Sequence, residues 1–515
     1  MSKLARGSFL ILMGNMIFRV GGYIYRVLMA ALLGPSAYGI LGATLPFQGI
    51  FQVLAAGGLP PAIAKYVSQY IALEEDDLAR QTIYTSLKIM IFLGIFFGLI
   101  MVFFVAPYIA NVFWAKPEAL LPLQAVSLIT PFSVIVGAFR GAFQGVYKME
   151  YILYTRAFEQ LFMISFASAF IIIGLSAFGA VLGTSVGFMA SALVSVILFK
   201  KYMWKYIPQP SQGFKFSLKE ELALAKELVI FSVPVTVTAL AEMAIYSACT
   251  IIMAKFLVSN LVGYFTAADP IARLPLMISI SIATTILPAT SAAFSTKNHE
   301  LLTKYVSQAY KYGMILVIPI CIGIALFAKT IMATVYFTNS DFTNGAMALS
   351  ILVIGMTFYS LFAISASIVQ GIGNPRIPMY VLLGGTAITI VLSWVMIPIY
   401  GIEGGALATT IASFIMMIPI LILTFRMTKV TPPIAFFGKL LLASLVMGAS
   451  ILLLPETLLG LIVGIVICPV IYLIVLILAK SFDSDDISAI RRFSHKFGPL
   501  SSIINKLLNI IERFL

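Results

Sequence analysis

Residues 457–479 read TLLGLIVGIVICPVIYLIVLILA and contain no charged side chain. A helix of about 20 apolar residues is long enough to cross the hydrocarbon core of a bilayer. The same character extends over the whole chain, because 61% of its 515 residues are hydrophobic and only 10% are charged. A soluble domain contains about 25% charged residues and could not bury so much apolar surface. The sequence therefore predicts an all-α polytopic membrane protein.

Hydropathy divides the chain into fourteen predicted transmembrane helices. Some neighbours are separated by only a few residues, as in the pairs 7–33 and 38–66, 152–174 and 177–199, and 377–399 and 403–425. The even-numbered connections and the two ends carry 27 of the 33 Lys and Arg residues. This bias predicts a cell (plasma or inner) membrane protein with both termini in the cytoplasm. The net charge of +13 then reflects orientation, and we expect no nucleic-acid partner.

Two stretches match when the chain is shifted by 226 residues: FQGVYKMEYILY at 143–154 and VQGIGNPRIPMY at 369–380. A repeat of six helices gives two copies that enter the membrane from the same side, as in many transporters. The predicted organisation is two parallel six-helix repeats plus two C-terminal helices. Its parts are an N-terminal lobe at 1–200, a cytoplasmic linker at 201–222, a C-terminal lobe at 223–428, the added helices at 429–480 and an amphipathic cytoplasmic tail at 481–515.

Three arginines lie inside predicted spans, where a charge costs about 2.5–3.5 kcal/mol. Arg19 and Arg26 share a face of the first helix with Tyr23 between them. Arg273 follows Asp269 by four residues, close enough to pair. Because an arginine fork binds phosphate well, we predict that Arg19, Arg26, Arg273 and Tyr23 bind an anionic substrate. In the alternative, Arg273 and Asp269 form a structural pair and Arg26 reaches the membrane surface.

Glu242 and Asp269 are the acidic residues of the same region. Glu242 fits a counter-charge or a ligand of a coupling ion, H⁺ or Na⁺, and Asp269 fits the partner of Arg273 or such an ion site. The two histidines and three cysteines have no metal-binding spacing, and no phosphate-binding loop is present. We therefore expect no metal, no other cofactor and no enzymatic activity.

Helix-breaking residues recur at related places in the two repeats and predict hinges around a central site, although ordinary kinking would also account for them. They are Gly57, Gly58, Pro60, Pro61, Pro234, Pro270 and Pro275.

Three motifs resemble one known superfamily. IFRVGGYIYRVLMAALLGPSAYG at 17–39 is similar to the first helix of flippases in the multidrug/oligosaccharidyl-lipid/polysaccharide (MOP) exporter superfamily. GGLPPAIAKYVSQY at 57–70 resembles its polysaccharide-transporter and stage V sporulation protein B branch. ARLPLMISISIATTILPATS at 272–291 resembles helix 8 of that branch and of the related lipid II flippases (MurJ). The resemblance covers residues 1–480 and implies the fold of MATE and MurJ transporters.

The resemblance also implies alternating access, export of lipid-linked saccharides and a cationic central cavity. Arg19 matches a functional arginine of the lipid II flippases. The position of their second arginine is occupied here by Tyr25, and this chain has its arginine one residue later, at Arg26. The position of their helix 8 arginine is occupied here by Pro270. Their two extra helices form a groove for the lipid tail, which implies the same role for residues 437–479.

Together these features predict a flippase that moves a polyprenyl-(di)phosphate-linked oligosaccharide or polysaccharide unit from the inner to the outer leaflet. Its partners would be the lipid-linked substrate, membrane lipids and glycosyltransferases of the same pathway, and we expect a monomer. One alternative is a MATE-like drug/cation antiporter, against which the arginines and extra helices count. Another is a membrane glycosyltransferase or polymerase, which would need a larger outer loop with catalytic carboxylates or histidines.

Overall fold

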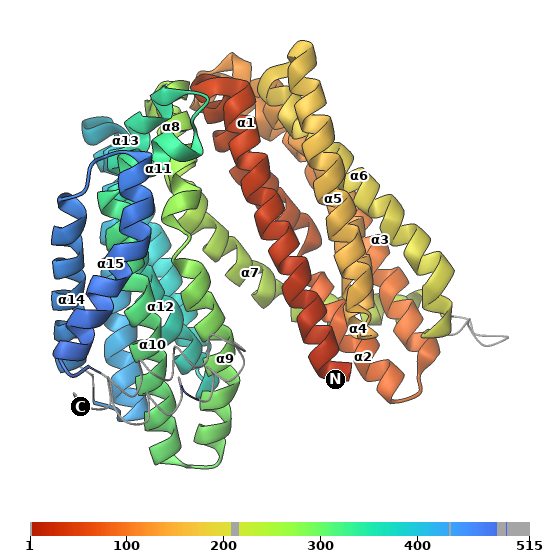
Figure 1. The fold of residues 1–515 in the computed structure, drawn as a ribbon. Coiled ribbons are helices and arrows are strands. Elements are labelled where there is room, and N and C mark those ends of the chain that lie inside the picture. The colour runs from red at the N-terminus through yellow and green to blue at the C-terminus, as the bar shows by residue number, and fades with distance from the viewer. Residues whose placement is uncertain (1–2, 208–215, 432–433, 482–490, 492–515) are drawn as a thin grey trace. The chain divides into compact units, whose positions relative to one another are not determined.

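The computed structural model describes residues 3–207, 216–431, 434–481 and 491, with the backbone alone for residues 3–19, Trp204 and Ile434. The described residues form helices and turns, with no strand among them. The predicted amphipathic tail at 481–515 lies almost wholly outside these residues. The main helices are α1 (Lys3–Ala56), α2 (Leu59–Ala72), α3 (Asp76–Ile100), α4 (Leu120–Gly145), α5 (Met149–Phe170), α6 (Ser176–Tyr202), α7 (Leu218–Phe256), α8 (Ser259–Ala272), α9 (Leu276–Ser295), α10 (His299–Leu326), α11 (Ala328–Val335), α12 (Ala346–Gly371), α13 (Arg376–Thr428), α14 (Ile434–Leu452) and α15 (Leu458–Leu478) (Figure 1).

Eleven stretches of the described chain are long and apolar enough to cross a membrane. Three of them, Val20–Ala72, Met149–Tyr202 and Arg376–Thr428, have 53, 54 and 53 residues. A helix of that length would measure about 80 Å, whereas the hydrocarbon core is about 30 Å thick. Each stretch is therefore long enough for two crossings. The all-helical membrane fold is confirmed, and the count of fourteen crossings stays a prediction.

A glycine with positive φ interrupts each of these three stretches. Gly34 has φ 68°, Gly174 has φ 97° and Gly401 has φ 63°. Only a residue without a Cβ atom adopts this conformation at little cost. The three interruptions fall at the boundaries that hydropathy predicts, near residues 33–38, 174–177 and 399–403.

The helix bounds repeat with the spacing found in the sequence. Helix α4 spans 120–145 and α12 spans 346–371, a shift of 226 residues at both ends. The last residues of α3 and α10, Ile100 and Leu326, differ by the same number, as do those of α6 and α13. The second helix of each repeat is an exception to this spacing. Helices α1 and α2 separate at 57–58, whereas α8 and α9 separate at 273–275.

The chain forms two compact units. The first contains Met1–Ala267, Thr338–Phe342 and Thr389–Gly405, and the second contains Ala268–Phe337, Thr343–Ile388 and Ala406–Leu515. In the first, buried side chains of α2, α3, α4 and α7 make one apolar cluster that includes Ile63, Ile83, Phe143 and Leu228. The lobe and linker boundaries at 200, 222 and 428 come from the repeat and stay predictions.

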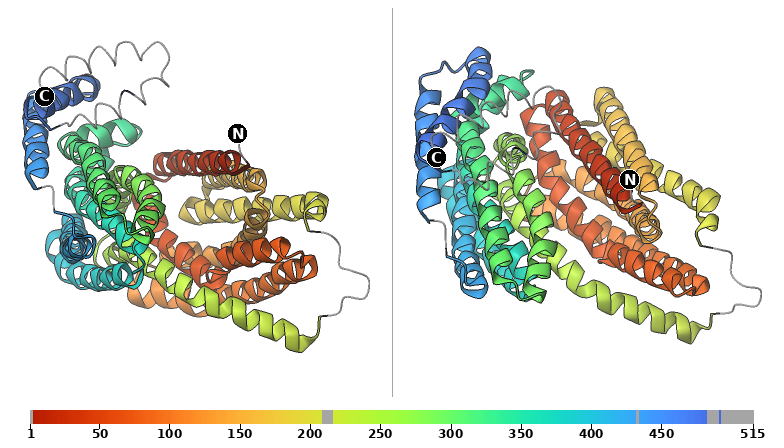
Figure 2. Two further views of the ribbon diagram at one scale, coloured as in Figure 1. Left: turned by 90° about the horizontal axis from the view of Figure 1, so that it is seen from below. Right: turned by 60° about the horizontal axis from the view of Figure 1, so that its bottom comes forward.

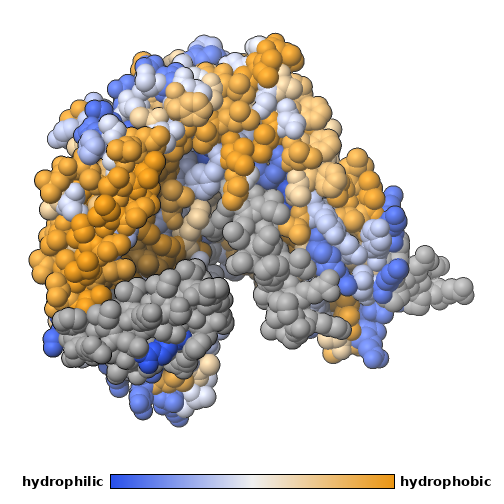
Figure 3. All heavy atoms as spheres, viewed as in Figure 1, coloured by the Kyte–Doolittle hydropathy of each residue, from blue (hydrophilic) through white to orange (hydrophobic). Residues whose placement is uncertain are grey.

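In the second unit, α14 and α15 lie side by side (blue in Figures 1 and 2). The Tyr472 hydroxyl of α15 donates a hydrogen bond to the Ile315 carbonyl of α10 at 2.8 Å. The outer surface of this pair is apolar (Figure 3), and Leu445, Leu459 and Ile465 are all exposed on it. Such a surface suits contact with lipid.

Candidate functional site

The first helix carries the predicted arginine face. Arg19, Tyr23 and Arg26 lie in the part of α1 before Gly34, and the Arg19 side chain falls outside the described residues. Tyr23 and Arg26 are half-buried. Apart from the backbone of α1 and the adjacent residues, no heavy atom of the described part of the chain lies within 4 Å of the position that a Cβ atom on Gly22 would take. Gly22 and Arg26 are one turn apart on the same face, so we call this the open face of α1.

The adjacent face of this helix, which carries Gly21 and Tyr25, is packed against the rest of the unit. A Cβ atom on Gly21 would lie 2.7 Å from Oε1 of Gln160, so α1 and α5 approach closely there. The Tyr25 hydroxyl donates to the Ala180 carbonyl of α6 at 3.3 Å, and Tyr25 is 5% exposed. A cation at position 25 would be buried between α1 and α6. The step from Tyr25 to Arg26 therefore moves the arginine onto the open face.

Arg26 differs in its partners from Arg273, the other predicted site arginine whose side chain the structure describes. Among the residues that the structure describes, no carboxylate forms an ion pair with Arg26. An arginine in an apolar helix needs an anion or access to water. The open face of α1 is thus a place where an anionic group can bind.

Glu242 lies on α7 of the same unit and is exposed. Its neighbours point inward, because Ala241 is buried and the Met243 side chain fills the space over Gly49 of α1. The carboxylate therefore faces away from α1. No described residue forms an ion pair with Glu242.

Asp269 and Arg273 form a tight ion pair in the second unit. The Arg273 Nε atom donates to Oδ1 and Oδ2 of Asp269 at 2.8 and 2.9 Å, and one terminal nitrogen donates to Oδ1 at 2.6 Å. Each side chain is 20% exposed. Asp269 lies in α8, but Arg273 lies in the turn that follows it, since the predicted helix at 260–294 divides into α8 and α9. The pair neutralises the charge of Arg273.

The predicted site residues are thus divided between the two units, with Arg19, Tyr23, Arg26 and Glu242 in the first and Asp269 and Arg273 in the second. Whether they line one cavity stays a prediction.

The predicted hinge residues occupy three kinds of position. Gly57 and Gly58 have φ 53° and 54° and separate α1 from α2, which begins with Leu59 and the adjacent Pro60 and Pro61. Pro275 caps α9, and Pro270 lies in the last turn of α8. Pro234 lies inside α7, which continues through it. The helix is interrupted at the first two of these places, between α1 and α2 and between α8 and α9. Motion about them stays a prediction.

A set of hydrogen bonds that the sequence does not indicate joins two segments at one end of the first unit, and we call this set the latch. The Trp114 Nε1 atom donates to the Ile251 carbonyl at 3.0 Å, and the Lys116 Nζ atom donates to the Leu257 carbonyl at 2.6 Å. Lys255 donates in return to the Phe113 carbonyl at 3.2 Å. Burial lowers the pKa of Lys116. The latch joins the end of the third predicted span to the end of α7, and therefore joins the two repeats.

A buried ion pair was also missed. Arg140, one of the 27 basic residues that were counted above at the connections and ends, lies inside α4 and pairs with Glu159 of α5 at 2.7 Å. Glu159 is 2% exposed, and Arg140 also donates to the Thr155 hydroxyl at 3.0 Å. Because both charges are satisfied within the unit, this pair fits a role in holding α4 to α5. The signal that could have revealed it is the lone carboxylate in an apolar span.

Comparisons with known proteins agree with this fold. The family described as "Polysaccharide biosynthesis protein" matches residues 4–294, more than half of the chain, and the MatE family matches residues 234–395. Stage V sporulation protein B of Bacillus subtilis is 25% identical over 64% of this chain and 66% of its own length. The lipid II flippase MurJ of the same organism is 24% identical over 76% of this chain and 77% of its own length.

Among solved structures, the lipid II flippase MurJ in an inward closed conformation superimposes with a TM-score of 0.73. It covers 91% of this chain and 98% of its own at 20% identity. A likeness at this identity concerns the fold alone, whereas the family match covers the sequence itself. The chain is therefore a multi-pass membrane protein and belongs to the polysaccharide biosynthesis protein family of the MOP exporter superfamily.

Proposed function

We propose that this protein is a flippase that moves a polyprenyl-(di)phosphate-linked oligosaccharide or polysaccharide unit from the inner to the outer leaflet by alternating access. The observation that carries the proposal is Arg26, a half-buried guanidinium on the open face of α1 with no ion-pair partner among the described residues. The relatives that are named lipid II flippases support a lipid as cargo.

The chemistry of α1 suits a phosphate head group. Arg19 and Arg26 follow one face of the helix, and each guanidinium can offer two parallel hydrogen bonds to phosphate oxygens. An unpaired charge at mid-membrane costs about 2.5–3.5 kcal/mol, and a bound phosphate would offset that cost. The lipid tail would lie along the apolar surface of α14 and α15 while the sugars cross with the head group.

The remaining details of the proposal concern its setting. The protein lies in the cell membrane with both termini in the cytoplasm, acts as a monomer, and receives its substrate from glycosyltransferases. A coupling ion, H⁺ or Na⁺, would bind at a carboxylate, and exposed Glu242 is the residue best placed for it. No ATP-binding motif is present in the sequence, so a gradient would supply the energy.

The test is a flipping assay in proteoliposomes with a fluorescent polyprenyl-diphosphate-linked disaccharide and a membrane-impermeant quencher. We expect Arg26→Ala to slow flipping at least tenfold and Arg26→Lys to restore part of the rate, because lysine keeps the charge but loses the fork. Lys219→Ala, which removes a charge from the exposed first turn of α7, is the control. A normal rate in Arg26→Ala would refute the assignment of the site.

A second candidate function is a MATE-like drug/cation antiporter. Two observations favour it: the MatE family match over residues 234–395 and the exposed carboxylate of Glu242. Uptake of an organic cation into proteoliposomes that carry a pH gradient distinguishes the two functions. An antiporter would accumulate the cation and lose this activity in Glu242→Gln, whereas the flippase would leave the cation outside.

A further inference from the structure

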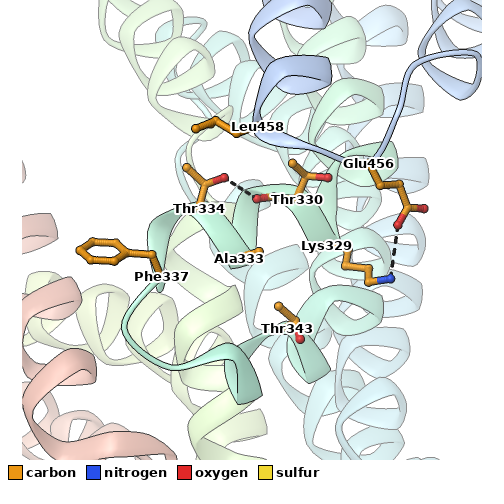
Figure 4. Close-up of a pocket in the computed structure, with 8 residues that line it drawn as sticks. All are labelled: Lys329, Thr330, Ala333, Thr334, Phe337, Thr343, Glu456 and Leu458. Carbon is orange, nitrogen blue, oxygen red and sulfur yellow. Dashed lines mark hydrogen bonds and ion pairs between the residues drawn. The ribbon is translucent and has the colours of Figure 1, made fainter.

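A cavity of about 550 Å³ lies at one end of the second unit, in a region that the proposed site does not use. Helix α11, the short helix at Ser340–Gly345 and the connection from α14 to α15 surround it. Its volume lies within the range of small-molecule sites. The residues that line it are Lys329, Thr330, Ala333, Thr334, Phe337, Thr343, Glu456 and Leu458 (Figure 4).

Hydroxyl groups make up much of the polar lining. Thr330, Thr334 and Thr343 come from α11 and from the short helix after it. The Thr334 hydroxyl donates to the Thr330 carbonyl at 2.7 Å, so its oxygen is left to accept a hydrogen bond (Figure 4). A set of neutral hydroxyl groups fits a ligand that itself carries many hydroxyls.

The charges at this cavity cancel. The Lys329 Nζ atom lies 3.3 Å from Oε2 of Glu456, and both side chains are 71% exposed. An ion pair this exposed is weak, so either group can turn toward a ligand. Together they offer three N–H donors and a carboxylate acceptor without net charge. This arrangement suits a neutral polyol better than a phosphate.

An aromatic ring stands at the edge of the cavity. Phe337 is 80% exposed and projects from the end of α11 (Figure 4). An exposed ring of this size presents an apolar face, and the C–H face of a pyranose ring can pack on it. Hydroxyl groups, a paired acid and base, and an exposed aromatic face can together contact the polar and the apolar surfaces of a sugar.

The cavity lies on the side of the membrane opposite the basic connections. Helix α10 begins beside Lys297 and Lys304 and runs to Leu326, and α11 follows at its far end (Figure 1). Basic connections mark the cytoplasmic side. With that orientation the cavity opens on the outer face, where a translocated glycan arrives.

We propose that this cavity binds a neutral saccharide on the outer face, namely the sugar portion of the lipid-linked substrate after its head group has crossed. The inference rests on the proposed function for the identity of the saccharide and for the orientation. A site of this kind would hold the glycan outside and oppose its return.

Binding of free sugar tests this directly, because it needs no lipid, phosphate or transport. The purified full-length protein is applied to an array of neutral and acidic oligosaccharides, and the best ligand is then titrated in solution. We expect saturable binding of neutral members. Phe337→Ala should weaken it roughly tenfold or more, about 1.4 kcal/mol, and Phe337→Trp should keep it. Phe294→Ala, which removes another exposed phenylalanine of the same unit, should leave it unchanged.

The ion pair gives a second measurement. Lys329→Gln leaves Glu456 unopposed and should lower the affinity for neutral sugar severalfold, and Glu456→Gln should do the same. Absence of binding on the array, binding of acidic members alone, or equal affinity of wild type and Phe337→Ala would each overturn the inference.

The two proposals fail separately. Arg26→Ala should slow flipping at least tenfold but leave the affinity for free saccharide unchanged, because Arg26 belongs to the other unit. A protein that flips its lipid in an Arg26-dependent way but binds no free sugar would refute the saccharide site alone. A protein that binds free sugar through Phe337 but flips normally without Arg26 would refute the proposed phosphate site alone.

Discussion

Asp269→Asn tests whether Arg273 serves the fold or the substrate. Arg273 and Asp269 share three N–H···O contacts of 2.6–2.9 Å, and each side chain is 20% exposed. The asparagine keeps the shape of the side chain but removes the charge that faces the guanidinium. If the pair is structural, its loss destabilises the turn between α8 and α9.

The size of the effect follows from the burial. Breaking a fully buried ion pair costs about 3–5 kcal/mol, and a hydrogen bond to a charged group contributes about 1.5–3 kcal/mol. Because one fifth of each side chain reaches solvent, we expect a loss of about 2–3 kcal/mol. For 515 residues, an unfolding entropy of about 2.1 cal/mol/K per residue converts this into a melting-temperature decrease of roughly 2–3 °C.

The assay is thermal unfolding of the purified protein in detergent, with a double-mutant cycle. Asp269→Asn and Arg273→Gln should each lower the melting temperature, and the double variant should recover most of the loss because no unpaired charge remains. The pair of Lys329 and Glu456 is the matched control, since its 71% exposure predicts coupling near zero.

Flipping is then measured in the same variants. If the pair is structural, the double variant keeps most of the wild-type rate. The reasoning is refuted if the double variant is as stable as wild type but flips no faster than Arg273→Gln, because Arg273 would then act on the substrate itself.

Two further predictions concern the backbone and the latch. Gly58→Ala should lower the free energy of unfolding, and with it the melting temperature, by at least the roughly 1–2 kcal/mol of free energy that a left-handed residue with a Cβ atom costs. The reason is that φ is 54° and the new atom would lie 2.7 Å from the Ser232 carbonyl oxygen. Gly22→Ala, with no atom within 4 Å, should cause no loss, and equal melting temperatures would contradict the argument. Lys116→Met removes the hydrogen bond to the Leu257 carbonyl and should speed modification of a cysteine introduced at buried Ala254 by a water-soluble thiol reagent. The native cysteines are buried and should contribute little to the modification. If Lys116→Met is modified no faster than the control variant Lys219→Met, the latch does not limit access of water to this end of the unit.

The positions of the helices could be predicted because lipid makes them depend on local sequence. Each crossing must satisfy its own backbone hydrogen bonds, so a break appears where apolar residues give way to a glycine, as at Gly34, Gly174 and Gly401. The repeat was visible for the same reason, since α4 and α12 keep their bounds at a shift of 226.

The features that the sequence did not reveal depend on contacts between distant segments. The latch uses backbone carbonyls of Ile251 and Leu257 as acceptors, and a carbonyl has no signature in the sequence. The break between α8 and α9 also departs from the repeat. It lies at 273–275, near Pro270 and Pro275, and not at the position equivalent to Gly58. The pairing of Arg140 with Glu159 could not be predicted because the two residues lie on different helices.

The distribution of charge changes what the proposed site can bind. The sequence alone counts three arginines toward an anionic ligand, but Asp269 already neutralises Arg273. Arg140 is likewise occupied by Glu159. Of the three arginines that the sequence predicts to bind an anion, Arg19 and Arg26 of α1 therefore remain for a head group. Positions 19 and 26 are two helical turns apart, about 10 Å along the axis of α1, so arginines at these positions could engage the two ends of a diphosphate and its first sugar. Anion recognition should then depend on α1 far more than on α8.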